Sequence, residues 1–138
     1  MGHRHRPRRA GDPVNVWEFF QARDAILAAQ SAAWDDEPYP YSAEASSKDL
    51  RGMVYGRIAV SEDSFLSVHE MIEIVGEEAT RRKYAYYLMS DGAPLWGEEC
   101  DPNLETAVHR QDADGKRVAS EPISFEDALA KAMAASAE

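Results

Sequence analysis

The chain has 138 residues and a formal net charge of −10, a length that allows one domain built on one modest hydrophobic core. No apolar run approaches the roughly 18 residues that a membrane-spanning helix needs, and the segment after Met1 lacks the apolar stretch of a signal peptide. Cys100 is the single cysteine, which excludes an intrachain disulfide and gives no indication of secretion. We therefore expect a cytoplasmic protein that does not enter a membrane.

Positive charge is concentrated at the start of the chain. Residues 1–9 contain four arginines and no acidic residue, and the remaining 129 residues keep 11 Lys and Arg against 25 Asp and Glu, a net charge of −14. This pattern predicts a flexible basic arm over residues 1–11 and a single α+β domain over residues 12–138. Such an arm is either an unstructured leader or a contact for nucleic acid or an acidic partner, whereas the acidic body disfavours broad nucleic-acid binding.

The first expected element is a helix. Asp12 and Pro13 are suited to its N-cap and first position, and apolar residues recur at helical spacing over residues 14–33. Arg23 lies in the same stripe, so we expect it at the edge of the core with its charged head in water, or else directed into a site. Residues 34–49 show no period and predict a long loop, which is either functional or mobile.

Apolar residues then alternate with period two, as is typical of strands. Asp91-Gly92 and Asp114-Gly115 are strong hairpin signals, and short connections favour antiparallel neighbours. The chain ends in a helix for which Ser124 is the expected N-cap. We expect strands at residues 53–60, 65–75, 82–89, 95–96, 106–111 and 116–119. The predicted fold class is α+β, an antiparallel meander of five or six strands with an N-terminal and a C-terminal helix covering one face.

The same periods predict the core. Residues that repeat every three to four positions in a helix, or every second position in a strand, share one face of that element. We expect the following residues to be buried: Phe19, Phe20, Leu27, Ile58, Leu66, Val68, Ile72, Ile74, Leu88, Phe125 and Leu129.

Glu70 interrupts this pattern, because it occupies an even position in a strand whose other even positions are apolar. A buried carboxylate costs several kcal/mol unless it is paired or protonated. Three explanations stay open. The pKa of Glu70 is raised and the residue acts as a general acid or base, or it is bound by Tyr84, Tyr86 or an arginine, or a bulge turns it into water.

Two further segments bear residues that suit a site. Tyr84 and Tyr86 share one face of their strand and Lys83 takes the other, an arrangement that serves packing or the stacking of bases. His109 is a candidate proton shuttle, and Arg110 points to the opposite face of that strand. His69 adjoins Glu70 and therefore faces away from it, which makes it the weaker candidate. No P-loop, dinucleotide or metal-ligand motif occurs, so we expect no cofactor and no metal.

In their order along the chain, these features resemble the TumE-type toxins of bacterial toxin–antitoxin systems. The resemblance covers roughly residues 52–135 and consists of an acid in the second strand, a Lys-Tyr-x-Tyr strand, an Asp-Pro break, a histidine segment, an Asp-Gly turn and a terminal helix. These features lie at Glu70, residues 83–86, 101–102, 109–110 and 114–115, and the helix from Ser124. The resemblance implies growth inhibition through action on RNA, and an antitoxin protein as partner.

RNA cleavage through the 2′-hydroxyl needs a proton acceptor, a proton donor and a cation near the phosphate. The catalytic candidates are Glu70, His109 and Tyr84. The substrate-binding candidates are Lys83, Arg110, Tyr86 and Arg23. If their strands present Glu70, Tyr84 and His109 on one face, these three side chains converge within about 10 Å. The alternative functions are a non-enzymatic protein-binding module and a small-molecule sensor with an acidic surface.

Overall fold

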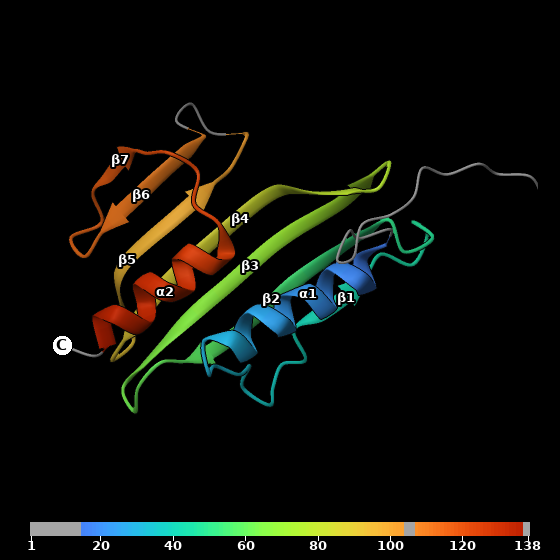
Figure 1. Cartoon of the computed structure of the whole chain (residues 1–138). Helices are drawn as coiled ribbons and strands as arrows, with labels where there is room; N and C mark the ends of the chain where they lie inside the picture. Colours follow the sequence, from blue (N-terminus) through green and yellow to red (C-terminus); the bar gives the residue numbers. More distant parts are fainter. Residues whose placement is uncertain (1–14, 104–106, 137–138) are drawn as a thin grey trace, which may run out of the picture.

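The computed structural model describes residues 15–103 and 107–136. Helix α1 (Val16–Ala29) precedes, and helix α2 (Phe125–Ser136) follows, a single seven-stranded sheet. Its strands are β1 (Tyr41–Ala43), β2 (Arg51–Ala59), β3 (Ser64–Val75), β4 (Glu78–Ser90), β5 (Ala93–Cys100), β6 (Val108–Asp112) and β7 (Arg117–Ala119). They lie in sequence order and every neighbouring pair is antiparallel (Figure 1). The predicted α+β meander with a helix at each end is therefore confirmed.

The long central strands follow from their sequences. Side chains of β3 and β4 alternate between buried and more exposed over most of their length, as the period of two predicts. The tight β4–β5 turn is the predicted Asp-Gly turn, in which Asp91 (φ 52°) and Gly92 (φ 80°) both adopt the left-handed conformation. Two successive positive φ angles match the right-handed twist of the flanking strands, which is why Asp-Gly closes this hairpin.

Both helices begin at a capping side chain. The Asn15 side chain accepts a hydrogen bond from the backbone of Glu18 (3.1 Å), so α1 starts at Val16. The cap predicted at Asp12 lies outside the described residues, as does the basic arm. The cap of α2 is confirmed, because Ser124 accepts from the backbone N–H of Asp127 (3.0 Å).

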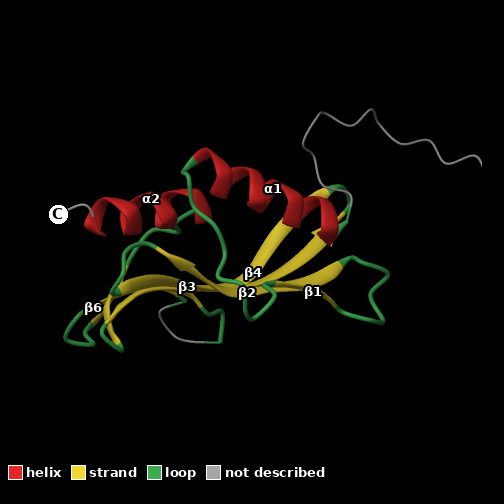
Figure 2. Cartoon of the chain, turned by 90° about the horizontal axis from the view of Figure 1, so that it is seen from below, coloured by secondary structure: helices red, strands yellow, loops and turns green. Residues whose placement is uncertain are grey.

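Both helices pack on the same face of the sheet (Figure 2). We call this the covered face; it carries Leu66, Val68 and Ile72 of β3, and all the predicted core residues are buried. The other face, which carries Tyr55, His69 and Met71, is the open face, and neither helix covers it. Among the described residues, no helix combines the length and the apolar character needed to cross a membrane.

The segment predicted as a loop over residues 34–49 is more ordered than expected. It contains β1, which pairs with β2, and an isolated bridge between Trp34 and Ile58. The Trp34 indole donates to the Tyr41 hydroxyl (2.8 Å), which in turn donates to Asp24 of α1. The pairing with β1 satisfies part of the backbone hydrogen-bonding groups along the edge of β2. A short strand therefore forms here although the sequence shows no period.

Candidate functional site

The strand register divides the predicted catalytic residues between the two faces. Directly paired residues of neighbouring antiparallel strands have their side chains on the same face. Glu70 pairs with Tyr84, and Tyr84 pairs with Cys100, which places all three on the covered face. His109 belongs to the adjacent row, in which His69 pairs with Ala85, Ala85 with Glu99 and Glu99 with His109. Glu70 and His109 therefore lie on opposite faces, and the prediction of one shared site is wrong.

The structure also places the two predicted charge partners on different faces. Lys83 pairs with Met71 and lies on the open face, so it does not assist Glu70. Arg110 pairs with Glu98 and lies on the covered face, where the sequence interpretation had it pointing away from Glu70. The register of β3 with β4 decides the placement of Lys83, and the register across β4, β5 and β6 decides that of Arg110.

Glu70 is held by a complete set of donors. The guanidinium of Arg23 donates from Nε to Oε1 (2.9 Å) and from Nη2 to Oε2 (2.7 Å), and the Tyr86 hydroxyl donates to Oε2 (2.6 Å). Glu70 has no solvent exposure. Such a two-pronged ion pair with an added hydrogen bond is the arrangement that makes a buried carboxylate tolerable. The second of the three explanations for Glu70 is therefore confirmed.

Arg23 is buried as well, contrary to the expectation that its head lies in water. Its guanidinium carbon lies 4.3 Å from the centre of the Phe19 ring and 4.6 Å from that of Phe125, so the planar cation is sandwiched between a ring of α1 and a ring of α2. Its donors meanwhile face Glu70 on β3. This one side chain ties both helices to the sheet.

The tyrosines complete this network. Arg81 donates to the Tyr86 hydroxyl (2.7 Å) and lies 4.2 Å above the Tyr84 ring, while the Tyr84 hydroxyl accepts from the backbone of Ile123 (3.2 Å). Burial, then the negative charge of Glu70, raise the pKa of Tyr86, and burial raises the pKa of Tyr84. Both phenols stay protonated at neutral pH, and the network around Glu70 is structural because no substrate in solvent reaches its carboxylate.

The open face has a different character. The His69 ring lies 5.5 Å from the ring of Tyr55 at 75°, and Tyr55 is 56% exposed. Partial burial and the nearby charge of Lys83 lower the pKa of His69, so the imidazole is neutral at pH 7. Its Nε2 atom has no hydrogen-bond partner within the part of the chain that the structure describes. His69 is thus a neutral proton acceptor beside a cation, on the face that the helices leave open (Figure 2), and its Nε2 atom is itself shielded from solvent.

Basic side chains outnumber acidic ones on the open face of β2, β3 and β4. The basic residues are Arg51, Arg57, Arg82 and Lys83, and the acidic residues are Glu73 and Glu78. The whole chain, in contrast, has a net charge of −10. Three of the four cations are ion-paired, Arg51 with Glu44, Arg82 with Glu73 and Lys83 with Asp101. The Arg57 guanidinium lies 5.1 Å above the Phe65 ring, and Lys83 lies 3.5 Å from Asp101.

On the open face, the described side chains of β5 and β6 leave less surface accessible to solvent than those of β2 to β4. His109 is 1% exposed, and its Nε2 lies 3.3 Å from the carboxylate of Glu99. The Tyr87 ring lies across Gly97, where a Cβ atom would come within 2.3 Å of the ring, so only glycine fits there. Within residues 15–103 and 107–136, no group of three His, Cys, Asp or Glu side chains is arranged to hold a metal ion. The accessible part of the open face is therefore β2 to β4.

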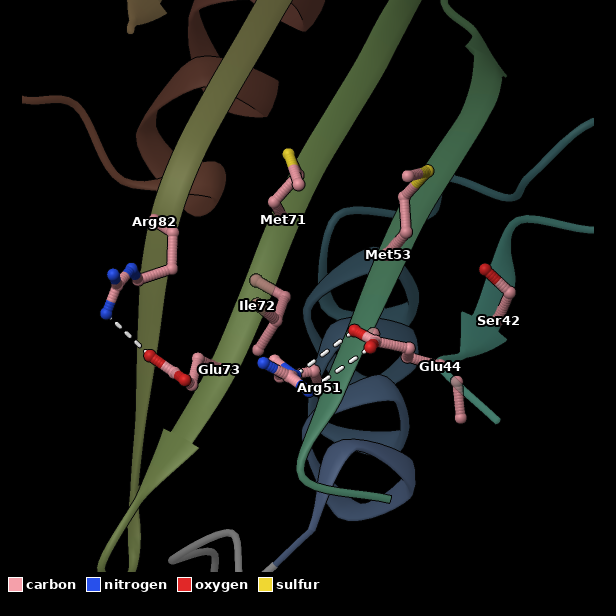
Figure 3. A pocket seen from close by; sticks show the side chains of 10 residues that line it. Ser42, Glu44, Arg51, Met53, Met71, Ile72, Glu73 and Arg82 are labelled. Carbon is pink, nitrogen blue, oxygen red and sulfur yellow. Dashed lines mark hydrogen bonds and ion pairs between the residues drawn. The ribbon is translucent and has the colours of Figure 1, made fainter. Parts of the chain in front are cut away.

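A hollow of about 470 Å³ lies at one end of this accessible part (Figure 3). Met53 and Met71 line it between two ion pairs, Arg51 with Glu44 (3.1 Å) on one side and Arg82 with Glu73 (2.5 Å) on the other. Its volume is within the range of small-ligand sites.

The sequence ranked His69 as the weaker candidate and gave no indication of this hollow. The alternation that turns Glu70 inward also turns His69 and Met71 outward, as the sequence already indicated. In a half-buried sheet, a buried charge such as Glu70 is the unusual feature of the sequence, whereas an outward histidine next to a methionine is common. Only the pairing of the neighbouring strands places Tyr55 and Lys83 near His69.

Comparisons of the chain with protein-family models, curated proteins and solved structures return no match. The resemblance to the TumE-type toxins therefore stays a prediction.

Proposed function

We propose that this protein binds single-stranded RNA on the open face of β2 to β4, and that it does so as a TumE-like toxin of a toxin–antitoxin system. The observation that carries the proposal is a sheet face on which Lys and Arg outnumber Asp and Glu and which bears an exposed aromatic ring, on a chain that is otherwise acidic. Phosphate binding requires clustered Lys and Arg, and base binding requires exposed ring faces.

The chemistry of this face suits a single strand. Tyr55 offers an exposed ring for a base, and Arg57 two residues along β2 and Lys83 on β4 offer charge to the phosphates. A sheet surface presents such groups at intervals of about 4.8 Å between strands, so successive nucleotides meet successive strands. The negative charge of the remaining surface repels RNA and confines it to this face.

The same face supplies groups for the RNA cleavage that the family resemblance implies. A neutral imidazole accepts a proton from a 2′-hydroxyl, and a neighbouring cation stabilises the charge that develops at the phosphate. In our proposal His69 has the first role, which requires that its buried Nε2 atom becomes exposed when RNA binds, and Lys83 has the second role. They replace Glu70 and His109, which are buried on opposite faces.

A protein partner is the second candidate for this face. Tyr55 and Met71 are 56% and 42% exposed, and aromatic and methionine side chains are enriched in protein interfaces. In this alternative the protein is a non-enzymatic binding module, and the partner is the antitoxin that the resemblance implies.

Binding of a labelled 12-nucleotide RNA, followed by fluorescence anisotropy over a series of salt concentrations, tests the proposal. We expect Lys83→Ala to weaken binding and to reduce the slope of log K against log salt by about 0.7, the value for one lost phosphate contact with a single strand. Arg110→Ala is the matched control, because it removes an exposed cation from the covered face. Absence of binding, or equal losses in the two variants, contradicts the proposal.

Expression of the intact chain, with cell growth and bulk RNA integrity followed together, tests the toxin role. We expect growth arrest with the wild-type chain and with Arg110→Ala, and its loss with Lys83→Ala. RNA that stays intact during arrest, with His69→Gln as toxic as the wild type, excludes His69 chemistry. A stable protein complex that forms without toxicity favours the protein-binding alternative.

A further inference from the structure

The hollow at Met53 and Met71 has a thioether floor and walls made of ion pairs. From these features we infer a binding subsite for a single nucleobase. The inference rests on the proposed function, since the base belongs to the RNA strand that the open face binds. It goes beyond the proposed function because it assigns one base of the RNA to the hollow between Met53 and Met71.

The floor of the hollow suits a ring. Met53 of β2 and Met71 of β3 are direct cross-strand partners, so their thioethers lie side by side on the open face (Figure 3). Thioether sulfur makes favourable contacts with aromatic rings, and unbranched methionine side chains adapt to the outline of the ring. Met71 is 42% exposed, which leaves its surface available to a ligand.

The ion pairs that form the walls of the hollow also suit an aromatic ring. The Arg51 guanidinium meets Glu44 through two of its nitrogens, Nε at 3.1 Å and Nη2 at 3.2 Å. A carboxylate bound in this way occupies one edge of the guanidinium and fixes its plane, while the flat face stays available for stacking. Glu73 holds Arg82 on the opposite wall through a single contact of 2.5 Å.

The charges favour a base over a phosphate in the hollow itself. Each wall is a neutral ion pair, and neither offers an uncompensated cation to an anion. Lys83, whose ammonium lies 3.5 Å from Asp101, is the direct cross-strand partner of Met71 and lies next to the hollow. A nucleotide whose base lies on Met71 therefore has its phosphate within reach of Lys83. A volume of about 470 Å³ holds one nucleotide and is too small for a helix or a second sheet.

Methyl NMR of the full chain labelled with ¹³C at the methionine methyl groups tests this subsite. A ring stacked on the floor shifts the Met53 and Met71 methyl signals upfield through its ring current. Met133 of α2 packs against the core and is the internal control. The probes are a short oligoadenylate, the same oligomer with abasic positions, and adenosine monophosphate.

We expect oligoadenylate to shift the Met53 and Met71 signals and the abasic oligomer to leave them in place, with Met133 unchanged in both. Binding of RNA without any shift at Met53 and Met71 overturns the subsite and leaves the proposed function standing. If the oligomers do not bind, the proposed function fails, and a shift with adenosine monophosphate alone then supports a nucleotide site. Absence of both effects overturns both proposals.

Two variants sharpen the assignment. Met71→Ala removes half of the floor, and we expect it to weaken oligoadenylate binding roughly tenfold, the effect of losing one stacked base. Arg51→Lys keeps the charge and removes the flat guanidinium, so it weakens binding if stacking matters and leaves it unchanged if only charge matters. Equal affinity of both variants and the wild type for oligoadenylate contradicts the inference. Shifts produced only by an aromatic-bearing protein partner, and not by nucleotides, overturn the choice of ligand.

Discussion

Glu70 and His69 are neighbours in β3, and the two faces that they occupy treat an ionisable group in opposite ways. On the covered face, Glu70 is fully buried and is bound by two nitrogens of Arg23 and the hydroxyl of Tyr86. On the open face, His69 is half-buried beside Tyr55, and its Nε2 has no partner among the described residues. The Glu70 carboxylate therefore stabilises the fold, whereas the Nε2 atom of His69 can still accept a hydrogen bond.

This difference shows that an ionisable residue in a core pattern is a poor indicator of a site. A buried charge is tolerated only when the structure compensates it, and compensation immobilises it and shields it from a substrate. On the open face, the Lys83 side chain is 40% exposed and has one longer ion pair, to Asp101 at 3.5 Å, and His69 is partly exposed, so both are more accessible than Glu70.

The largest effect is expected on the covered face. Glu70→Gln leaves the Arg23 cation buried without a counter-charge, and removing one partner of a buried ion pair costs about 3–5 kcal/mol. Chemical denaturation measures this loss. The double variant Arg23→Met/Glu70→Gln removes both charges and should recover part of it. A loss below about 1 kcal/mol for Glu70→Gln, typical of a surface position, contradicts the structural role.

A pair of adjacent tyrosines compares the two faces directly. Tyr86→Phe removes the hydroxyl that donates to Glu70 and accepts from Arg81, at an expected cost of about 1–3 kcal/mol in the free energy of unfolding. Tyr87→Phe on the open face is the control and should stay within about 0.5 kcal/mol of the wild type. Equal costs for the two variants would remove the distinction between the faces.

The smallest effect concerns pH. The pKa of His69 is lowered from 6.5 in the folded protein, so near that pH the unfolded chain binds more protons and stability rises with pH. As the pH falls below 6.5, the wild type therefore loses stability relative to His69→Gln, until the folded protein itself becomes protonated at this site. Denaturation curves between pH 8 and pH 5 measure the difference between the two proteins. A relative gain in stability on acidification has the wrong sign for this account.

The fold was predictable because its signals are local. The alternation of Leu66, Val68 and Ile72, and the turn at Asp91-Gly92, depend on residues close together in the chain, and both are confirmed. β1 was not predictable in this way, because the pairing that creates it lies in β2 and in contacts of Tyr41 with α1.

The site was less predictable because it depends on register across several strands. Alternation within one strand gives the face of Glu70 relative to His69, but not the face of His109, which lies beyond a non-strand connection after Cys100. Bulges between Met71 and Ile72 and between Leu88 and Met89 shift the pairing further. Arg23, 47 residues away from Glu70, gave no local sign that it binds that carboxylate.

The central claim is that the open face binds RNA and the covered face stabilises the fold. Hydroxyl-radical oxidation with and without RNA, read by mass spectrometry, is its most direct test. Tyr55 and Met71 on the open face and Trp17 on α1 are all exposed and reactive, at 56%, 42% and 40% of their surface. We predict that RNA protects Tyr55 and Met71 and leaves the oxidation of Trp17 unchanged. Protection of Trp17 with Tyr55 and Met71 still oxidised would contradict the account.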